Sequence, residues 1–202
     1  MKISRQRKTK NPCQICFLHQ DLCICAVIPR LTLATRIVLV VHAKELKRTT
    51  NTGRLAMHAL VNSEMIVRGQ NKVPVDLTPL LQDTYETFLF YPSEEAVELS
   101  EIVSVARSKP IQLIVPDGNW RQASKVSTRH PELAQVPRVK ISEKNLASYH
   151  LRKEHFAEGL STLEAIAKAL GLIEGSMVGD QLLRLYQAKL KATMLGRGLT
   201  KQ

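Results

Sequence analysis

The chain has 202 residues, enough for one main domain and a small additional module, and its hydrophobic content of 44% supports a buried core. Its 29 Lys and Arg residues outnumber 18 Asp and Glu residues, and the formal net charge of +11 favours a polyanionic partner such as RNA. No run approaches the roughly 18 apolar residues of a membrane span, and residues 1–12 form a basic arm without the apolar stretch of a signal peptide. We therefore expect a cytoplasmic protein with no membrane partner.

All four cysteines lie close together near the N-terminus, in a C-x2-C-x6-C-x-C pattern. They are Cys13, Cys16, Cys23 and Cys25. Two closely spaced pairs of thiolates are typical of a structural zinc site in which the protein fills all four coordination positions. Disulfide bonds and free thiols are the alternatives, although disulfides are unusual in a cytoplasmic protein. We expect a zinc-binding module over residues 13–30, followed by a catalytic domain over residues 31–202.

The rest of the chain alternates apolar runs of strand length with segments of helical spacing. The predicted strands are Thr35–Val41, Thr87–Tyr91, Ile111–Val115 and Pro137–Ile141. The predicted helices are Leu55–Val61, Glu94–Ala106 with Ser93 as N-cap, Arg121–Thr128, Ser161–Leu170 closed by Gly171, and Met177–Met194, and a turn is expected around Gly69. This alternation predicts an α/β domain built around a mostly parallel sheet.

In such a sheet, ligands bind beyond the carboxyl ends of the strands. That rule points to His42, to Asp117 and to the stretch after Ile141. Asp117 belongs to a Pro-Asp-Gly sequence, which is also an ordinary turn signal. Trp120, the only tryptophan, suits either the wall of a pocket for a planar ligand or the core, and a lone histidine such as His42 is often structural.

The sequence Ser161-Thr-Leu-Glu164 fits a capping box ahead of an apolar helix, and capping alone accounts for both Ser161 and Glu164. A helix N-terminus also presents N–H groups to an anion such as a carboxylate or a phosphate. Ser161 and Thr162 are therefore candidates for ligand binding as well as for capping.

Two polar segments carry candidate RNA contacts, although a solvated loop would have the same composition. The candidates are Lys44, Lys47, Arg48 and Asn51 in the first segment and Tyr149, Arg152 and Lys153 in the second. Lys and Arg side chains bind phosphates, and a tyrosine ring stacks on bases.

Together these segments resemble the DTW-domain family of aminocarboxypropyltransferases, which is related to the SPOUT-type RNA methyltransferases. The matching pieces are Cys13-x2-Cys16-x6-Cys23-x-Cys25, His42-x-x-Glu45, Asn51-Thr52, Asp117-x-x-Trp120, Tyr149-x-x-Arg152 and Ser161-Thr-x-Glu164-Ala165. Two positions depart from the family pattern: Asn119 replaces the usual Thr, and Ala43 replaces the usual Pro.

The resemblance implies a knotted C-terminal half that binds S-adenosylmethionine. It implies transfer of the 3-amino-3-carboxypropyl group to N3 of a uridine, with release of methylthioadenosine, and a tRNA substrate modified in its variable loop. We expect catalytic roles for Asp117, Trp120 and Glu164, and cofactor binding by His42, Asp117, Trp120, Ser161 and Thr162. The alternatives are a SPOUT-type RNA methyltransferase and a non-enzymatic zinc-containing RNA-binding protein.

Overall fold

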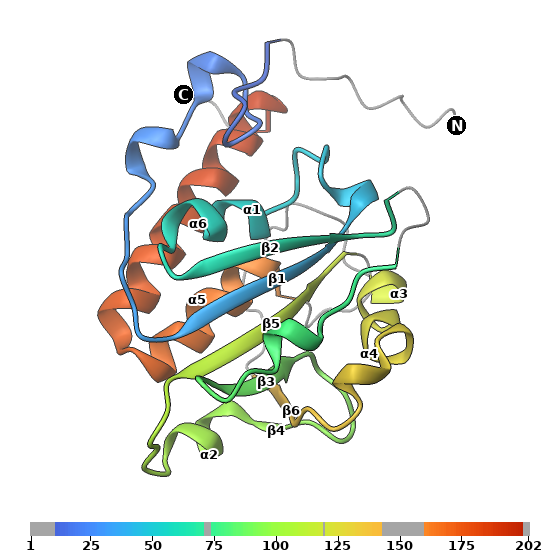
Figure 1. Ribbon diagram of the computed structural model, residues 1–202. Coiled ribbons are helices and arrows are strands. Elements are labelled where there is room, and N and C mark those ends of the chain that lie inside the picture. Colours follow the sequence, from blue (N-terminus) through green and yellow to red (C-terminus); the bar gives the residue numbers. More distant parts are fainter. Residues whose placement is uncertain (1–10, 71–73, 119, 143–159, 200–202) are drawn as a thin grey trace.

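The computed structural model describes residues 11–70, 74–118, 120–142 and 160–199, with the backbone alone at Trp120. Its centre is a six-stranded sheet in which every neighbouring pair of strands is parallel. The strands are β1 (Arg36–His42), β2 (Ser63–Arg68), β3 (Glu86–Phe90), β4 (Val97–Glu98), β5 (Ile111–Asp117) and β6 (Arg138–Lys140), in the order β2-β1-β5-β3-β6-β4. The predicted α/β class with a parallel sheet is confirmed (Figure 1).

Helices cover both faces of this sheet (Figure 1). They are α1 (Gly53–Ala59), α2 (Leu99–Val103), α3 (Trp120–Ala123), α4 (Lys125–Arg129), α5 (Thr162–Ile173) and α6 (Ser176–Gly196). Short 3-10 turns occur at Gln20–Leu22, Cys25–Val27, Ala43–Glu45, Thr78–Leu80 and Pro131–Leu133. Helices α1, α5 and α6 pack on one face, and α3 and α4 lie on the other. No helix in the described ranges has the length and apolar character to cross a membrane.

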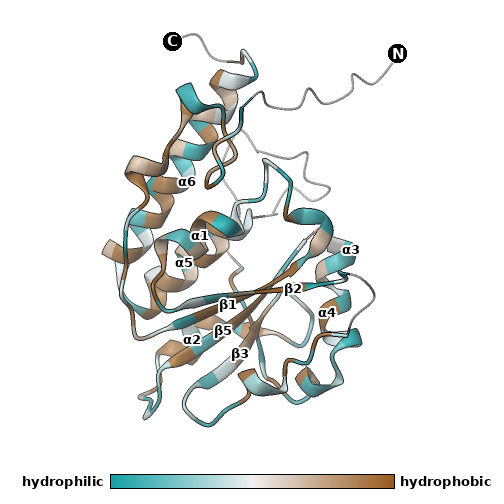
Figure 2. Cartoon of the chain, turned by 45° about the horizontal axis from the view of Figure 1, so that its top comes forward, coloured by the Kyte–Doolittle hydropathy of each residue, from teal (hydrophilic) through white to brown (hydrophobic). Residues whose placement is uncertain are grey.

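Strand alternation divides the core into two layers. In β1, Ile37, Leu39 and Val41 pack into the cluster that contains α1, α5 and α6, whereas Val38 and Val40 pack into the smaller cluster on the α4 side. The five inner residues of β1 are all buried, as expected for a parallel strand covered on both faces. The central strands accordingly form a brown, hydrophobic band between helices in Figure 2.

The four predicted strands correspond to β1, β3, β5 and β6, whereas β2 is not predicted from the sequence pattern. Its sequence, Ser63-Glu-Met-Ile-Val-Arg68, carries charged residues because β2 is an edge strand with a partly exposed face. The Arg36 guanidinium of β1 pairs with Glu64 of β2 at 2.5 Å. Polar residues of this kind obscure the apolar pattern from which a buried strand is recognised.

The helix predicted over Glu94–Ala106 with Ser93 as its N-cap is wrong for most of its length. Val97 and Glu98 form β4, which pairs with β6, and α2 spans only Leu99–Val103 after Glu98 as N-cap. Pairing of β4 with β6 is a tertiary interaction that competes with local helix formation.

The other predicted helices are present with different bounds. Helix α1 begins and ends two residues earlier than expected, and Ser124 separates α3 from α4. Helix α5 continues past Gly171 to Ile173, and α6 reaches Gly196. The N-cap at Ser161 is confirmed, with both hydrogen bonds of the capping box.

Candidate active site at the carboxyl ends of the strands

The Asp117 carboxylate, at the end of β5, joins three segments that lie far apart in the sequence. Its Oδ2 accepts a hydrogen bond from Nδ2 of Asn51 at 2.6 Å, and its Oδ1 accepts one from Oγ1 of Thr162 at 2.6 Å. Asp117 is 5% exposed, and Asn51 is 6% exposed. The buried carboxylate is therefore held through both of its oxygens by side chains from two separate loops.

The loop before α1 and the start of α5 are held together by a second contact. The backbone N–H of Leu163 donates to Oγ1 of Thr52 at 3.2 Å. The Ser161 hydroxyl accepts from the Glu164 N–H, and the Glu164 carboxylate accepts from the Ser161 N–H at 2.9 Å. These bonds occupy most of the first-turn N–H groups of α5, so that capping, rather than an open anion site, is what the structure shows there.

Gly53 allows this close approach. A Cβ at Gly53 would lie 3.0 Å from Cδ2 of Leu39 and 3.1 Å from Cγ2 of Thr162, closer than side-chain carbons normally pack. A glycine at the first position of α1 therefore lets this helix start directly against the start of α5, beside Thr162.

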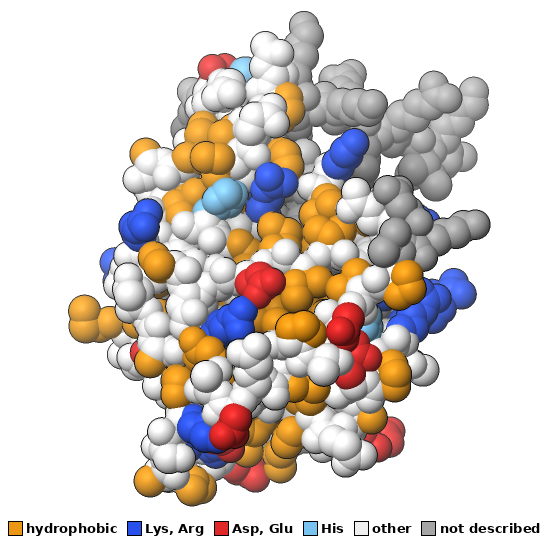
Figure 3. All heavy atoms as spheres, viewed as in Figure 1, with side chains coloured by type: hydrophobic (Ala, Val, Ile, Leu, Met, Phe, Trp, Pro, Cys, Tyr) orange, Lys and Arg blue, Asp and Glu red, His pale blue; other side chains and the backbone are white. Residues whose placement is uncertain are grey.

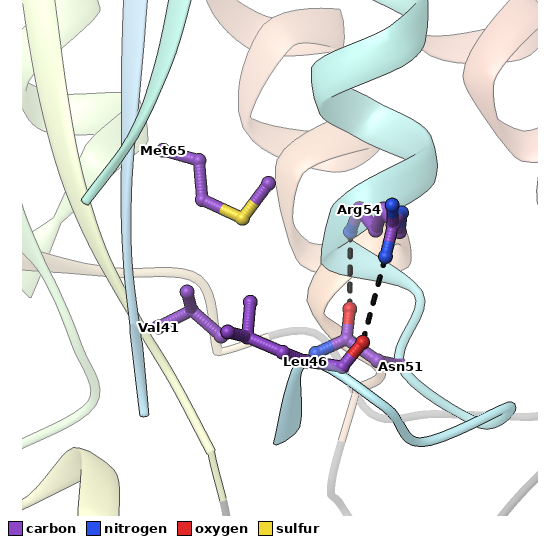
Figure 4. A pocket seen from close by; sticks show the side chains of 5 residues that line it. All are labelled: Val41, Leu46, Asn51, Arg54 and Met65. Atoms are coloured by element: carbon purple, nitrogen blue, oxygen red, sulfur yellow. Dashed lines mark hydrogen bonds between the residues drawn. The ribbon is translucent and has the colours of Figure 1, made fainter. Parts of the chain in front are cut away.

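A small pocket lies next to Asn51, lined by Val41, Leu46, Asn51, Arg54 and Met65 (Figure 4). The Arg54 backbone N–H donates to Oδ1 of Asn51 at 3.1 Å, which directs the amide nitrogen of Asn51 towards Asp117. The Arg54 guanidinium lies 4.2 Å from the centre of the Phe17 ring, in the cysteine segment. A chain of contacts thus runs from the cysteine segment through Arg54 and Asn51 to the Asp117 carboxylate.

His42 lies on the other side of the sheet from this cluster. Val41 is the register partner of Asp117, and His42, one residue further along β1, points to the opposite face together with its own partner Arg68. Burial lowers the pKa of His42, and the positive charges of Arg68 and Lys44 lower it further. The structure therefore does not bring His42 into the Asp117 cluster, although both were predicted to bind the same cofactor.

The four cysteine sulfurs converge, with all Sγ atoms within 4.8 Å of one another. The Sγ atoms of Cys13 and Cys25 are 3.5 Å apart, and those of Cys16 and Cys23 are 3.8 Å apart. These separations match the distance of about 3.8 Å between ligands of a tetrahedral zinc–thiolate site, and they exceed the roughly 2.0 Å of a disulfide. The residues present therefore fit a structural zinc ion.

A buried lysine of α6 lies against this cysteine cluster. Lys189 is 1% exposed, and its Nζ donates to the backbone oxygen of Cys16 at 2.6 Å. Burial lowers the pKa of Lys189 to about 8, while the charges of the cysteines act in the opposite direction. Lys189 thus places a positive charge beside the four sulfurs, an arrangement that suits metal-bound thiolates, and ties the cysteine segment to the last helix.

The remaining predicted site residues are placed as follows. Trp120 begins α3 directly after the Asp117 turn, but its side chain, like Asn119, lies outside the described residues, as do Tyr149, Arg152 and Lys153. Lys44, Lys47 and Arg48 are exposed, and Arg48 pairs with the buried Glu45 at 3.2 Å. Arg54 and Arg68 are not among the predicted site residues, and Arg68 lies on β2, a strand that the sequence pattern does not predict.

The fold and this site define an α/β protein with a polar cluster at the strand ends and a four-cysteine module. A model of the DTW domain matches residues 10–194. The chain therefore belongs to the DTW-domain family, as the sequence motifs predict.

Individual curated proteins are similar over most of this chain. They include tRNA-uridine aminocarboxypropyltransferase 2 of Drosophila melanogaster, 29% identical over 82% of this chain and 67% of that protein. The protein of the same name from Macaca fascicularis is 26% identical over 90% of this chain and 63% of its own length. tRNA-uridine aminocarboxypropyltransferase A of Arabidopsis thaliana is 27% identical over 89% and 78%, respectively. The chain thus spans roughly two thirds of the length of these animal relatives, and no solved structure matches it.

Proposed function

We propose that this protein transfers the 3-amino-3-carboxypropyl group of S-adenosylmethionine to N3 of a uridine in tRNA, in the variable loop. The family match over residues 10–194 and the names of the curated relatives support a transferase that acts on tRNA. The net charge of +11 supports a polyanionic substrate.

The observation that carries this proposal is the meeting of three family motifs at one carboxylate. Asn51, Asp117 and Thr162 come from separate loops and are joined by two hydrogen bonds of 2.6 Å. They lie at the carboxyl edge of a parallel sheet, which is where α/β enzymes bind their ligands. Motifs that served only to stabilise the fold would not need to place their polar residues together at this edge of the sheet.

The reaction requires an N3–carbon bond to form as the bond between sulfur and the methionine-side methylene breaks. The sulfur keeps the electron pair and leaves as methylthioadenosine, and the N3 proton must be removed. We propose that the Asp117 carboxylate accepts this proton, because it is the carboxylate at the strand ends on which Asn51 and Thr162 converge. Asn51 and Thr162 hold the carboxylate in a fixed orientation. The carboxylate can then position the uracil ring so that N3 attacks the methylene carbon in line with the breaking bond to sulfur.

Trp120, immediately after the Asp117 turn, is proposed to form one wall of the nucleoside pocket. Ser161 and Thr162 are proposed to border the amino-acid end of the donor, with Thr162 fixed by Asp117. The hydrogen bonds of the capping box are enough to explain Glu164. Its catalytic role stays a prediction.

Two further proposals follow from the family resemblance. The four cysteines hold one structural zinc ion, which their sulfur geometry fits. The C-terminal half is knotted, and the path of residues 143–159, which lie outside the described residues, is what a crystal structure must trace to test this. The cytoplasmic location stays a prediction of the sequence.

The direct test is to incubate the purified protein with S-adenosylmethionine and unmodified tRNA and to analyse nucleosides and small products by mass spectrometry. We expect aminocarboxypropyl-uridine and methylthioadenosine in equal amounts. S-adenosylhomocysteine would instead identify a methyltransferase, and tRNA binding without either product would identify a non-enzymatic RNA-binding protein.

The Asp117→Asn variant tests the assigned base. It keeps the size of the side chain but removes the proton acceptor, and we expect kcat to fall by about 10²–10⁴-fold, the usual contribution of a general base. The matched control is Asp180→Asn, an exposed carboxylate of α6, which is expected to retain normal kcat. Equal kcat values for the Asp117→Asn variant and the wild type would contradict the role of Asp117.

A further inference from the structure

Arg68 is a buried cation that forms no ion pair with the described residues. It ends β2, is 4% exposed, and donates through Nη2 to the backbone oxygen of Gln122. Its Nε is buried and has no hydrogen-bond partner among the described residues. Burial lowers the pKa of Arg68, and the charge that adds to this effect is that of another cation, Arg129. A buried guanidinium in such surroundings is costly unless an anion binds to it.

Other positive groups lie around this guanidinium. His42 is the register partner of Arg68 on β1 and points to the same face of the sheet. Arg121, Lys125 and Arg129 follow one another at intervals of four residues along α3 and α4, so that they line one side of this helical segment. Arg121 and Arg129 are exposed. Lys and Arg side chains are visible at the edge of the molecule where α3 and α4 lie (Figure 3).

We propose that Arg68 and Arg129 bind one phosphate group of the RNA substrate, and that Arg121 and Lys125 extend this contact along the RNA backbone. The assignment rests on the proposed function, since it requires an RNA substrate. Nη2 of Arg68 is already held by Gln122, which fixes the guanidinium, and the residues that cover its buried Nε must move when the phosphate binds. A guanidinium with donors in a rigid fork matches a phosphate group well.

A carboxylate also binds to a guanidinium, so the carboxylate of S-adenosylmethionine is the second anion that Arg68 could bind. The donor carries a sulfonium and an ammonium group besides one carboxylate, so its net charge is positive, and a group of cations repels it. The RNA backbone carries only negative charge. The observations therefore favour a phosphate of the RNA.

The position of this site suits a nucleotide that reaches the Asp117 cluster. Arg68 lies on β2 and Asp117 on β5, with β1 between them. Two strand spacings correspond to about 10 Å within the sheet, and the two side chains also point to opposite faces. A nucleotide and its flanking phosphate can span this distance across the strand ends, with the base on the Asp117 side and the phosphate on the Arg68 side.

The test compares Arg68→Met, Arg68→Lys and Arg129→Gln with a matched control, Arg184→Gln, which removes an exposed charge from α6. The probe is unmodified tRNA, and its Kd is measured at several salt concentrations together with the KM for S-adenosylmethionine and the Tm. We expect Arg68→Met and Arg129→Gln each to raise the Kd for tRNA about tenfold and to reduce the slope of log K against log salt by about 1, the effect of one lost phosphate contact. Arg68→Lys is expected to restore part of the affinity, and Arg184→Gln is expected to stay within about twofold of the wild type.

The Tm of Arg68→Met distinguishes a role of Arg68 in anion binding from a role in stabilising the fold. If Arg68 serves to bind an anion, Arg68→Met removes an uncompensated buried charge, and its Tm should equal or exceed that of the wild type. If Arg68→Met fails to fold, the exposed Arg129→Gln variant still decides the question.

Unchanged tRNA affinity in a folded Arg129→Gln variant would overturn the proposal, and so would an increase confined to the KM for S-adenosylmethionine, which would assign the anion to the donor. Because tRNA binding is measured without turnover, these outcomes are independent of whether the wild type forms methylthioadenosine. The absence of that product would defeat the proposed function on its own.

Discussion

At the scale of single residues, hydrogen bonding and steric fit around Asp117 determine the geometry of the site. Asn51 was predicted to contact RNA, yet its amide bonds Asp117 and its carbonyl accepts from the Arg54 backbone. An asparagine in a polar loop looks the same in the sequence whether it contacts RNA or forms an internal hydrogen bond. Its internal role depends on Asp117, which is 66 residues away in the chain.

The Gly53→Ala variant tests the close approach of α1 and α5. The new Cβ would contact Leu39 and Thr162, and such overpacking typically costs about 1–3 kcal/mol. We expect a lower free energy of unfolding, measured by urea denaturation, together with lower activity, because displacement of Thr162 disturbs its bond to Asp117. The matched control is Gly171→Ala in α5, where a Cβ would meet only ordinary contact at 3.5 Å and stability should not fall.

At the scale of elements, polar side chains hold the connections between strands and helices in place. Glu132, in the 3-10 turn Pro131–Leu133, accepts from the Leu77 N–H at 3.0 Å and lies 3.0 Å from Nδ1 of His130. It therefore links the segment before β3 to the turn after α4. The capping box at Ser161 is local, and it fixes where α5 begins.

The pH dependence of stability should report the Glu132 contact. Burial raises the pKa of Glu132, but hydrogen bonds from backbone N–H groups and from His130 lower it by more, so its pKa lies below the ordinary value. A lowered folded-state pKa stabilises the protein above the unfolded-state pKa of about 4.3, and this stabilisation disappears as the pH falls through the folded-state value. We expect the urea midpoint of the wild type to exceed that of Glu132→Gln at pH 7 and the difference to shrink towards pH 3.

Glu94→Gln, which changes an exposed carboxylate, is the control for this series. The urea midpoint of Glu94→Gln should differ little from that of the wild type at every pH. A difference for Glu132→Gln that stayed constant from pH 7 to pH 3 would show that ionisation of Glu132 does not contribute.

At the scale of the whole molecule, the cysteine segment is packed as part of the main core. Cys13, Cys16, Leu18 and Ile24 belong to the same buried cluster as β1, α5 and α6. The Lys189 ammonium of α6 bonds Cys16, and Phe17 stacks on Arg54 of α1. A change in the cysteine segment should therefore affect both the last helix and the neighbourhood of Asp117.

If the four cysteines hold zinc as proposed, its removal should destabilise the entire protein. Thiolates without the metal repel one another, and the free energy of metal binding contributes directly to folding. We expect a strong chelator to lower the Tm by about 5–10 °C, measured by scanning calorimetry alongside the zinc content. Cys23→Ser, which alters the exposed ligand, should reproduce this loss without creating a core cavity. A zinc content well below one per chain, with an unchanged Tm after chelation, would count against a structural metal.

The class of fold, the four-cysteine cluster and the family can all be predicted from the amino-acid sequence. These depend on local patterns: apolar runs in β1 and β5, two closely spaced cysteine pairs and ordered short motifs. The N-cap of α5 was also predictable, because Ser161 and Glu164 lie within one helical turn.

Which of the polar residues come into contact depends on the three-dimensional fold. It showed β2 at the edge of the sheet, paired β4 with β6, and brought Asn51 and Thr162 to Asp117. It also separated His42 from Asp117, because successive residues of a strand point to opposite faces once the register with β5 is set. Register and strand order arise from contacts between segments distant in the chain, and a pattern within one segment does not contain them.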